Sequence, residues 1–228
     1  MNGVRGVVLF DFGGTLDADG ARWSVRFHAA YVTAGGQQPF AVFEEAFRAS
    51  DRALVRVTGI STLGFRAMVD LQAALVLAHL PDGRALRREQ IVDEFHAAAL
   101  AVIRRNQELL ARLQQSYRLA VVSNFTGNLG PCLEELDLMR YFSAVADSGR
   151  VGVTKPDPRL FRHALESLGA KSEPVWMVGD NFEADIRPAA SLGMQTAWLA
   201  PPVARSPDAG LPTVRLTTLT ELAEVLPS

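Results

Sequence analysis

Four short and largely apolar runs constrain the fold of this chain more than any other feature of its sequence. They occupy residues 7–10, 118–122, 174–178 and 195–199. Runs of this length, bounded by polar or turn-forming residues, are typical of strands buried on both faces. Helices closed by glycine are expected over 160–168 and 183–192. The alternation therefore predicts an α/β fold, with a parallel sheet covered on both faces by helices.

The segment between the first two runs interrupts this alternation. Residues 18–105 contain no good strand signal. Apolar residues at helical spacing mark the stretches 22–33, 41–56, 63–79 and 87–103. A further helix over 106–115 then returns the chain to the sheet. We therefore predict an α/β core made of residues 1–17 and 106–228, with an all-helical subdomain inserted over 18–105.

Charge and cysteine content narrow the class of protein. The 228 residues include 23 Lys and Arg against 25 Asp and Glu, a net charge of −2, which argues against a surface that coats nucleic acid. The single cysteine, Cys132, excludes an internal disulfide and a cysteine-based zinc cluster. No apolar stretch approaches the ~18 residues of a membrane span. We expect a cytoplasmic protein without nucleic-acid or membrane partners.

Acidic residues follow two of the predicted strands. Asp11 precedes a Gly-Gly-Thr turn at 13–15, and a carboxylate beside backbone N–H groups suits a nucleophile or a metal ligand next to an anion cradle. Asp180 and Asp185 lie around the start of a predicted helix, a spacing that suits a hard divalent cation. Each group also fits a structural role, as a turn former or as the N-cap of a helix.

Two further segments contain polar side chains that could bind a ligand. Ser123 and Asn124 add a hydroxyl and an amide after the second run, a pair that would equally well start a helix. Lys155 lies in a segment where Pro156 and Pro158 restrict the backbone, which a surface turn would also explain. Because ligands of parallel sheets bind beyond the carboxyl ends of the strands, we expect these groups to share one site.

The joint occurrence of these clusters, in this order, resembles the haloacid dehalogenase-like superfamily of aspartate-nucleophile hydrolases, which are mostly phosphatases. Its four motifs are matched by residues 9–16, 122–124, 152–158, and 179–186 with 190–193. The resemblance spans almost the whole chain. It implies a Rossmann-like, doubly wound core, and it implies that the inserted helices are the cap of one subclass.

The resemblance also implies roles for individual residues. It makes Asp11 the nucleophile that forms an aspartyl-phosphate, and Lys155 the cation that neutralises charge there. It places Mg²⁺ between the Asp11 carboxylate, the Gly13 carbonyl and Asp180, with Asp185 helping directly or through water. The implied substrate-binding residues are Gly14, Thr15, Ser123 and Asn124. The implied partner is a small phosphorylated metabolite, and the chain would be a monomer or a homodimer.

One position departs from the family pattern. Phosphatases of the family usually carry a second aspartate two residues after the nucleophile, where it donates a proton to the leaving group, and this chain has Gly13 there. Such proton transfer typically contributes ~10²–10⁴-fold in rate. Asp17 and Asp19 lie close by in the sequence and could substitute, but we expect them to solvate the loop and cap the hinge.

Three functions remain open. The first is a Mg²⁺-dependent phosphohydrolase that lacks the usual acid, and the second is a weak or non-catalytic protein that binds phosphoryl ligands. The third, a 2-haloacid dehalogenase, ranks lower because Asp180 keeps the metal carboxylate. A phosphonoacetaldehyde hydrolase is excluded, because no lysine for a Schiff base precedes Lys155.

Several residues of the inserted helices could face a substrate. They are Arg22, Trp23, Arg26, His28, Tyr31 and Arg66. For each of them we favour a role in helix packing or on a solvated face. Trp23 and Phe27, four residues apart on one helix, are typical of a packing pair.

Overall fold

Six parallel strands form a single sheet in the computed structural model, which describes residues 4–170, 172–208, 210–211 and 213–226. The order across the sheet is β3-β2-β1-β4-β5-β6, the doubly wound arrangement that places its switch point between β1 and β4. The strands are β1 (Gly6–Phe10), β2 (Tyr117–Ser123), β3 (Ala144–Asp147), β4 (Val175–Gly179), β5 (Gln195–Leu199) and β6 (Val214–Leu216). The predicted α/β fold class is confirmed.

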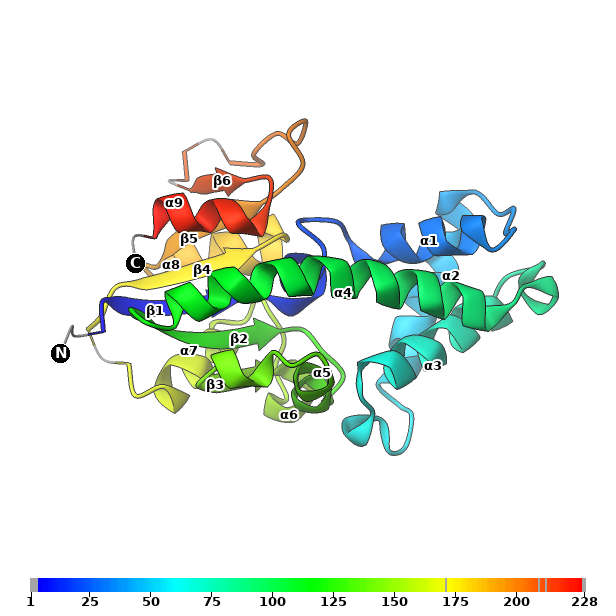
Figure 1. Ribbon diagram of the computed structural model, residues 1–228, viewed down its shortest axis with the longest axis horizontal. Helices are drawn as coiled ribbons and strands as arrows, with labels where there is room; N and C mark the ends of the chain where they lie inside the picture. The colour runs from blue at the N-terminus through cyan, green and yellow to red at the C-terminus, as the bar shows by residue number, and fades with distance from the viewer. Residues whose placement is uncertain (1–3, 171, 209, 212, 227–228) are drawn as a thin grey trace.

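Helices cover the sheet and build a second layer beyond it (Figure 1). They are α1 (Trp23–Thr33), α2 (Phe40–Leu54), α3 (Phe65–Ala78), α4 (Arg88–Leu113), α5 (Leu129–Glu135), α6 (Ser148–Val151), α7 (Pro158–Ser167), α8 (Arg187–Ser191) and α9 (Leu222–Val225). Short helical turns are η1 (Phe12–Leu16), η2 (Ile60–Thr62), η3 (Gly83–Ala85), η4 (Met139–Tyr141), η5 (Phe182–Ile186) and η6 (Leu219–Glu221).

The alternation of side chains along β1 divides the core into two parts. Val8 and Phe10 point to one face, where they join a cluster that includes residues of α4, α5 and α9. Val7 and Leu9 point to the other face, against α7 and α8. All four side chains are fully buried, which explains why this strand is a continuous apolar run rather than an alternating one.

Helices α1, α2, α3 and the first half of α4 form the cap, which lies beyond the carboxyl edge of the sheet (Figure 1). The predicted separate helices at 87–103 and 106–115 are wrong, because α4 is one helix of 26 residues. Nothing between Ile103 and Asn106 breaks it, and Asn106 is buried, with its amide donating to the Leu16 carbonyl at 3.0 Å. Helix α4 therefore contributes to both the cap and the core.

Strands β3 and β6 were not predicted. They have four and three residues, too short to produce a hydrophobic pattern that stands out from a loop. Both lie at the edges of the sheet. The helix expected over 183–192 is divided into η5 and α8, and Pro188 lies in the first turn of α8, where a residue without an N–H is tolerated.

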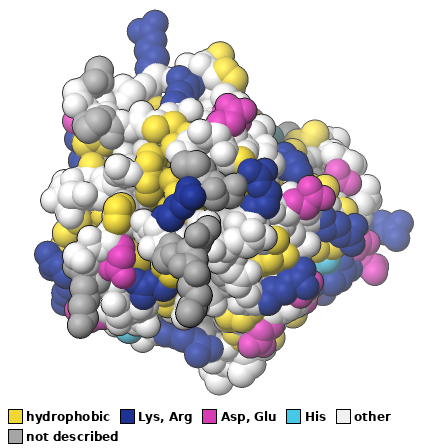
Figure 2. All heavy atoms as spheres, turned by 60° about the vertical axis from the view of Figure 1, so that its left-hand side comes forward, with side chains coloured by type: hydrophobic (Ala, Val, Ile, Leu, Met, Phe, Trp, Pro, Cys, Tyr) yellow, Lys and Arg dark blue, Asp and Glu magenta, His cyan; other side chains and the backbone are white. Residues whose placement is uncertain are grey.

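The outer surface of the core carries charges of both signs. On the end of the core remote from the cap, basic side chains are scattered rather than gathered into one patch (Figure 2). In the part of the chain that the structure describes, none of the helices is both long enough and apolar enough to cross a membrane.

Asp147, at the end of β3, holds the loop that follows β2. Its carboxylate accepts the backbone N–H groups of Gly127, Leu129 and Gly149 at 2.9–3.0 Å. We expect Asp147→Asn to lower the free energy of unfolding by about 1–3 kcal/mol, because an amide cannot accept all three bonds. Urea denaturation measures this, with the exposed Asp137→Asn as control, and equal stability of the two variants would contradict the assignment.

Candidate active site

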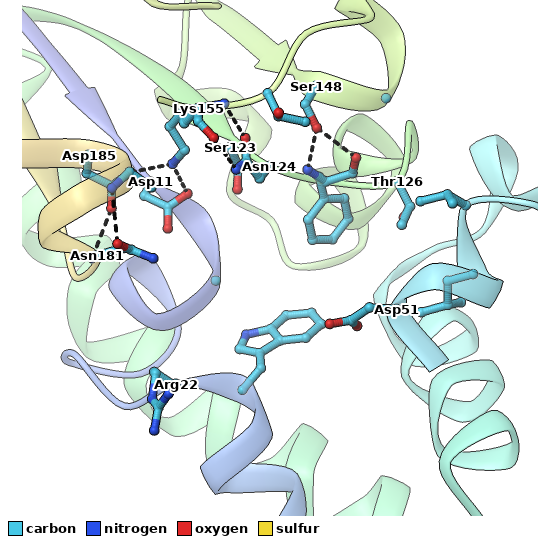
Figure 3. Close-up of a pocket in the computed structure, with 18 of the residues that line it drawn as sticks. Asp11, Arg22, Asp51, Ser123, Asn124, Thr126, Ser148, Lys155, Asn181 and Asp185 are labelled. Atoms are coloured by element: carbon cyan, nitrogen blue, oxygen red, sulfur yellow. Dashed lines mark hydrogen bonds and ion pairs between the residues drawn. The ribbon is translucent and has the colours of Figure 1, made fainter. Parts of the chain in front are cut away.

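A cavity of about 680 Å³ lies between the carboxyl edge of the sheet and the cap. The residues that the sequence assigned to the site and that line this cavity are Asp11, Gly13, Ser123, Asn124, Lys155, Asp180 and Asp185. They come from four separate segments of the chain, and the close-up in Figure 3 shows most of them at one end of the cavity. The topology therefore brings the strand-end groups together, as expected for a parallel sheet.

Lys155 lies at the centre of this group. Its buried ammonium Nζ is 2.7 Å from Asp11 Oδ1 and 2.5 Å from Asp185 Oδ1, and it donates to the Val122 carbonyl at 2.9 Å. Burial disfavours the ammonium, but the two carboxylates outweigh this effect and raise the pKa of Lys155. Lys155 therefore carries its charge throughout the physiological pH range.

Asn124 fixes the backbone of Lys155. The Lys155 N–H donates to Asn124 Oδ1 at 2.7 Å, and Asn124 Nδ2 donates to the Lys155 carbonyl at 3.0 Å (Figure 3). Both polar atoms of this side chain are thus used within the protein. Ser123 is different, since it is buried at the cavity wall and its hydroxyl has no hydrogen-bond partner among the described residues.

Asp11, Asp180 and Asp185 form a cluster whose carboxylate oxygens lie within 4.8 Å of one another. Lys155 is the one cation in contact with them in the described structure, so the ionised cluster keeps two uncompensated negative charges. Burial and the neighbouring carboxylates raise the pKa of Asp180 well above its usual range, and burial raises the pKa of Asp185 to about 6. A divalent cation fits this donor set in charge and in ligand type.

Two glycines let these carboxylates approach the backbone. At Gly14 (φ +96°) a Cβ would lie 2.6 Å from Asp180 Oδ2, and at Gly179 a Cβ would lie 2.3 Å from Asp185 Oδ2. Any side chain at either position would displace a carboxylate. The two positions therefore require glycine for steric reasons, and at Gly14 the left-handed backbone adds a second reason.

Two polar groups of the turn at 13–15 are used within the protein. The Gly14 N–H donates to Asp17 Oδ1 at 2.7 Å, and the Thr15 hydroxyl donates to Asp180 Oδ1 at 3.3 Å. Neither Gly14 nor Thr15 lines the cavity. The Gly14 N–H and the Thr15 hydroxyl therefore hold neighbouring carboxylates in place, and the roles of both residues in substrate binding stay predictions.

Asp17 is a buried structural residue, contrary to the expectation that it solvates the loop. In addition to the hydrogen bond from the Gly14 N–H, its carboxylate accepts hydrogen bonds from Trp23 Nε1 at 2.8 Å and from Arg26 Nη1 at 2.6 Å, and both donors belong to α1. Asp19 binds Arg105 at 2.6 Å and the Leu219 N–H at 2.9 Å. The contacts of Asp17 and Asp19 thus join the cap to the core.

Trp23 combines the expected packing with a position in the cavity wall. Its ring packs against those of Phe12, Phe27, Phe65, Phe95 and Phe125, with centroids 5.3–6.3 Å away. It also lines the cavity beside Gly13. By contrast, His28, Tyr31 and Arg66 bond to Gln38, Asp82 and Asp93 and do not line it.

Sequence reasoning missed the polar groups of the cap wall. Asp51 of α2 lies across the cavity from Asp11 and Lys155 (Figure 3), and Gln72 of α3 donates to it. The rest of this wall is mostly apolar, with Phe47, Leu54, Val55 and Met68. Although Asp51 is exposed at the cavity surface, desolvation raises its pKa to about 6, against the effect of the Gln72 hydrogen bond. Arg22 also lines the cavity, and its Nη1 lies 3.5 Å from Glu44 Oε1.

The geometry agrees with a family model. The model of haloacid dehalogenase-like hydrolases matches residues 6–193, so the chain belongs to this family of hydrolases. The human haloacid dehalogenase-like hydrolase domain-containing protein 3 is 33% identical over 158 residues, which are 67% of this chain and 62% of that protein. The phosphoserine phosphatase of Thermus thermophilus is 42% identical over 91 residues, 39% of this chain and 36% of that enzyme.

Structural similarity includes a protein described by another activity than the phosphatase above. A crystal structure described as a dehalogenase superposes with a TM-score of 0.66 at 18% identity, over 100% of this chain and 99% of that one. This likeness shows the fold alone. The matched stretches cover 36% to 62% of the two sequence relatives, so the activity has to be argued from the residues of the site.

The charge balance of the site predicts how the protein responds to the loss of Lys155. Lys155→Met should lower the free energy of unfolding by about 3–5 kcal/mol at neutral pH, because it leaves buried carboxylates unpaired. Removing the ammonium raises the carboxylate pKa values further, and a raised acid pKa in the folded state costs stability as pH increases. The deficit should therefore grow as the pH rises through about 6, where Asp185 already titrates.

Thermal unfolding in the presence of a chelator, followed from acidic to mildly alkaline pH, measures this deficit. The matched control is Arg159→Met, which removes an exposed cation paired with Asp157 and should show little pH-dependent loss. A deficit for Lys155→Met that stays constant with pH would contradict the electrostatic explanation.

Proposed function

We propose that the protein is a Mg²⁺-dependent phosphohydrolase in which Asp11 is the nucleophile. The observation that carries this proposal is the position of the Asp11 carboxylate at the cavity wall, ion-paired with Lys155 and beside two further acidic residues. The substrate is a small phosphorylated metabolite, for which the cavity of about 680 Å³ has room. The relatives named as phosphatases are consistent with this choice.

Each residue of the site has a separate task in this reaction. Lys155 holds Asp11 through Oδ1, which leaves the other carboxylate oxygen to attack phosphorus and form the aspartyl-phosphate. The unpartnered Ser123 hydroxyl donates to a phosphoryl oxygen. Asn124 positions Lys155 through its backbone. In phosphoryl transfer this positioning and neutralisation of charge supply most of the rate.

The metal ion would be held by the Asp11 carboxylate, the Gly13 carbonyl and Asp180, with Asp185 contributing directly or through water. When bound, it supplies positive charge opposite the phosphoryl oxygens. Thr15 and Gly14 keep Asp180 in place. The acidic cluster also argues against a 2-haloacid dehalogenase, because three carboxyl groups gathered at one point suit a divalent cation.

A protein that binds phosphoryl ligands with little turnover is the second candidate. The observation that favours it is Gly13, which supplies no side chain for proton transfer. Both candidates share the metal site and the anion site, and they differ in whether the ligand is cleaved.

The first test is release of phosphate from acetyl phosphate and para-nitrophenyl phosphate in the presence of Mg²⁺. We expect turnover by the wild type and none above the blank for Asp11→Asn, since the amide cannot attack phosphorus. Asp137→Asn, on an exposed residue, is the matched control. Retained binding of phosphate without turnover would favour the binding protein, and metal-independent chloride release from chloropropionate would favour the dehalogenase.

The second test is the effect of Mg²⁺ on thermal unfolding. Mg²⁺ should raise the Tm of the wild type in a saturable way at neutral pH, because it binds the folded carboxylate cluster. The rise should shrink at acidic pH, where protons compete for the same oxygens, and should be smaller in Asp180→Asn. A Tm that does not respond to millimolar Mg²⁺ at neutral pH would contradict the metal site.

A further inference from the structure

Gly13 is glycine because of its neighbour and not because of its backbone. Its φ and ψ of −75° and 115° are open to any residue, unlike the left-handed backbone of Gly14. A Cβ at Gly13 would lie 3.1 Å from Trp23 Nε1 and 3.3 Å from Trp23 Cε2. These contacts are tighter than ordinary van der Waals contacts, so a side chain at position 13 requires the Trp23 indole to shift.

Trp23 is not free to move out of this space. Its indole N–H donates to the buried Asp17 at 2.8 Å, and its ring packs among five phenylalanine rings. Asp17 is fixed in turn by Arg26, whose guanidinium lies 4.3 Å from the centroid of the Phe95 ring. Displacing the indole would break a buried hydrogen bond and open a gap in the aromatic cluster.

The nearby carboxylates do not replace the missing acid. Asp17 is fully buried, with both oxygens accepting hydrogen bonds, so it has no access to a ligand. Asp19 is held by Arg105 and Leu219 and does not line the cavity. No histidine, tyrosine or cysteine of the described chain lines it either.

Asp51 is the remaining carboxyl group of the cavity outside the acidic cluster. It lies on the cap wall across the cavity from Asp11 (Figure 3) and accepts a hydrogen bond from Gln72. The cap helices also contribute Phe47, Leu54 and Met68 to the cavity wall. In this position Asp51 faces the body of the substrate rather than the bond that breaks.

From these contacts we infer that the site acts on phosphates whose leaving oxygen departs as a stable anion, namely acyl phosphates and the phosphate esters of acidic phenols. The inference rests on the proposed function and narrows its substrate class. The apolar and aromatic cap wall suits the body of such a leaving group. The carboxylate of Asp51 disfavours a leaving group that carries a further negative charge.

The chemistry balances without an acid. A carboxylate oxygen of Asp11 forms a bond to phosphorus while the bond from phosphorus to the leaving oxygen breaks, and its electron pair leaves with the carboxylate or phenolate. Water then attacks the aspartyl-phosphate, releases dihydrogen phosphate with both protons of that water, and regenerates the Asp11 carboxylate. An alkoxide is too basic to leave in the first step unless it is protonated.

The test is the dependence of kcat/KM on the pKa of the leaving group, measured for the wild type with a series of para-substituted phenyl phosphates of nearly constant size. This parameter reports phosphoryl transfer to Asp11 even where the second step limits kcat. We expect kcat/KM to fall ~10²-fold or more from the most to the least acidic phenol, the size of a missing acid-base contribution. Acetyl phosphate should be a good substrate, and glycerol phosphate should be a poor one.

Asp51→Asn tests the rival proton donor. An unchanged steep dependence in this variant supports the inference. If kcat/KM of the wild type does not depend on the leaving-group pKa, the inference is overturned. If, in that case, the Asp51→Asn variant shows a steep dependence, Asp51 is the proton donor. Absence of Asp11-dependent hydrolysis of even the most acidic phenyl phosphate overturns the proposed function itself, so the two failures are distinguishable.

The role of Trp23 is tested by introducing a carboxyl group at position 13, where phosphatases of the family carry their acid. Gly13→Asp alone should give no gain with unsubstituted phenyl phosphate, because the new side chain meets the indole. Gly13→Asp combined with Trp23→Leu should raise kcat/KM for it and flatten the leaving-group dependence, whereas Trp23→Leu alone should not. A gain from Gly13→Asp alone overturns the assignment of Trp23. If the double variant does not fold by circular dichroism, the wild-type series still decides the substrate class.

Discussion

The ion pairs of Lys155 are the interaction on which the rest of the site depends. Three carboxylates gather at the ends of β1 and β4, and without a cation their mutual repulsion would force them apart or protonate them. The Lys155 ammonium binds Asp11 and Asp185, but one positive charge cannot balance all three carboxyl groups when they are ionised. The same arrangement therefore stabilises the fold, orients Asp11, the proposed nucleophile, and leaves a cluster of oxygens that suits a divalent cation.

A second set of contacts fixes the cap on the core. Asp17 lies in the core next to the turn at 13–15, yet its partners Trp23 and Arg26 belong to the first helix of the cap. Because the same carboxylate also accepts the Gly14 N–H, the conformation of the turn and the placement of α1 are coupled. Helix α4 adds a continuous connection, since it runs from the cap into the layer that covers the sheet.

The sheet and the acidic cluster could be predicted from the sequence because both depend on local signals. A buried parallel strand is a continuous apolar run, and its polar end must lie at the sheet edge, so the sequence alone was enough to place Asp11, Ser123 and Asp180 together. The short edge strands β3 and β6 carried no such signal. Asp51 could not be found either, because which face of α2 meets the cavity is decided by how the cap packs on the core.

The two adjacent glycines of the turn at 13–15 show why a sequence motif alone does not determine the reaction of a site. Gly14 is required by its left-handed backbone and by the Asp180 carboxylate against its Cα, so its role is to make room for the acidic cluster. Gly13 has an ordinary backbone, and a Cβ there would lie nearest to the Trp23 indole. Since Trp23 comes from the cap, the residue that decides whether an acid fits beside Asp11 lies outside the catalytic motifs. In the proposed function the cap therefore limits the chemistry of the site as well as the shape of the substrate.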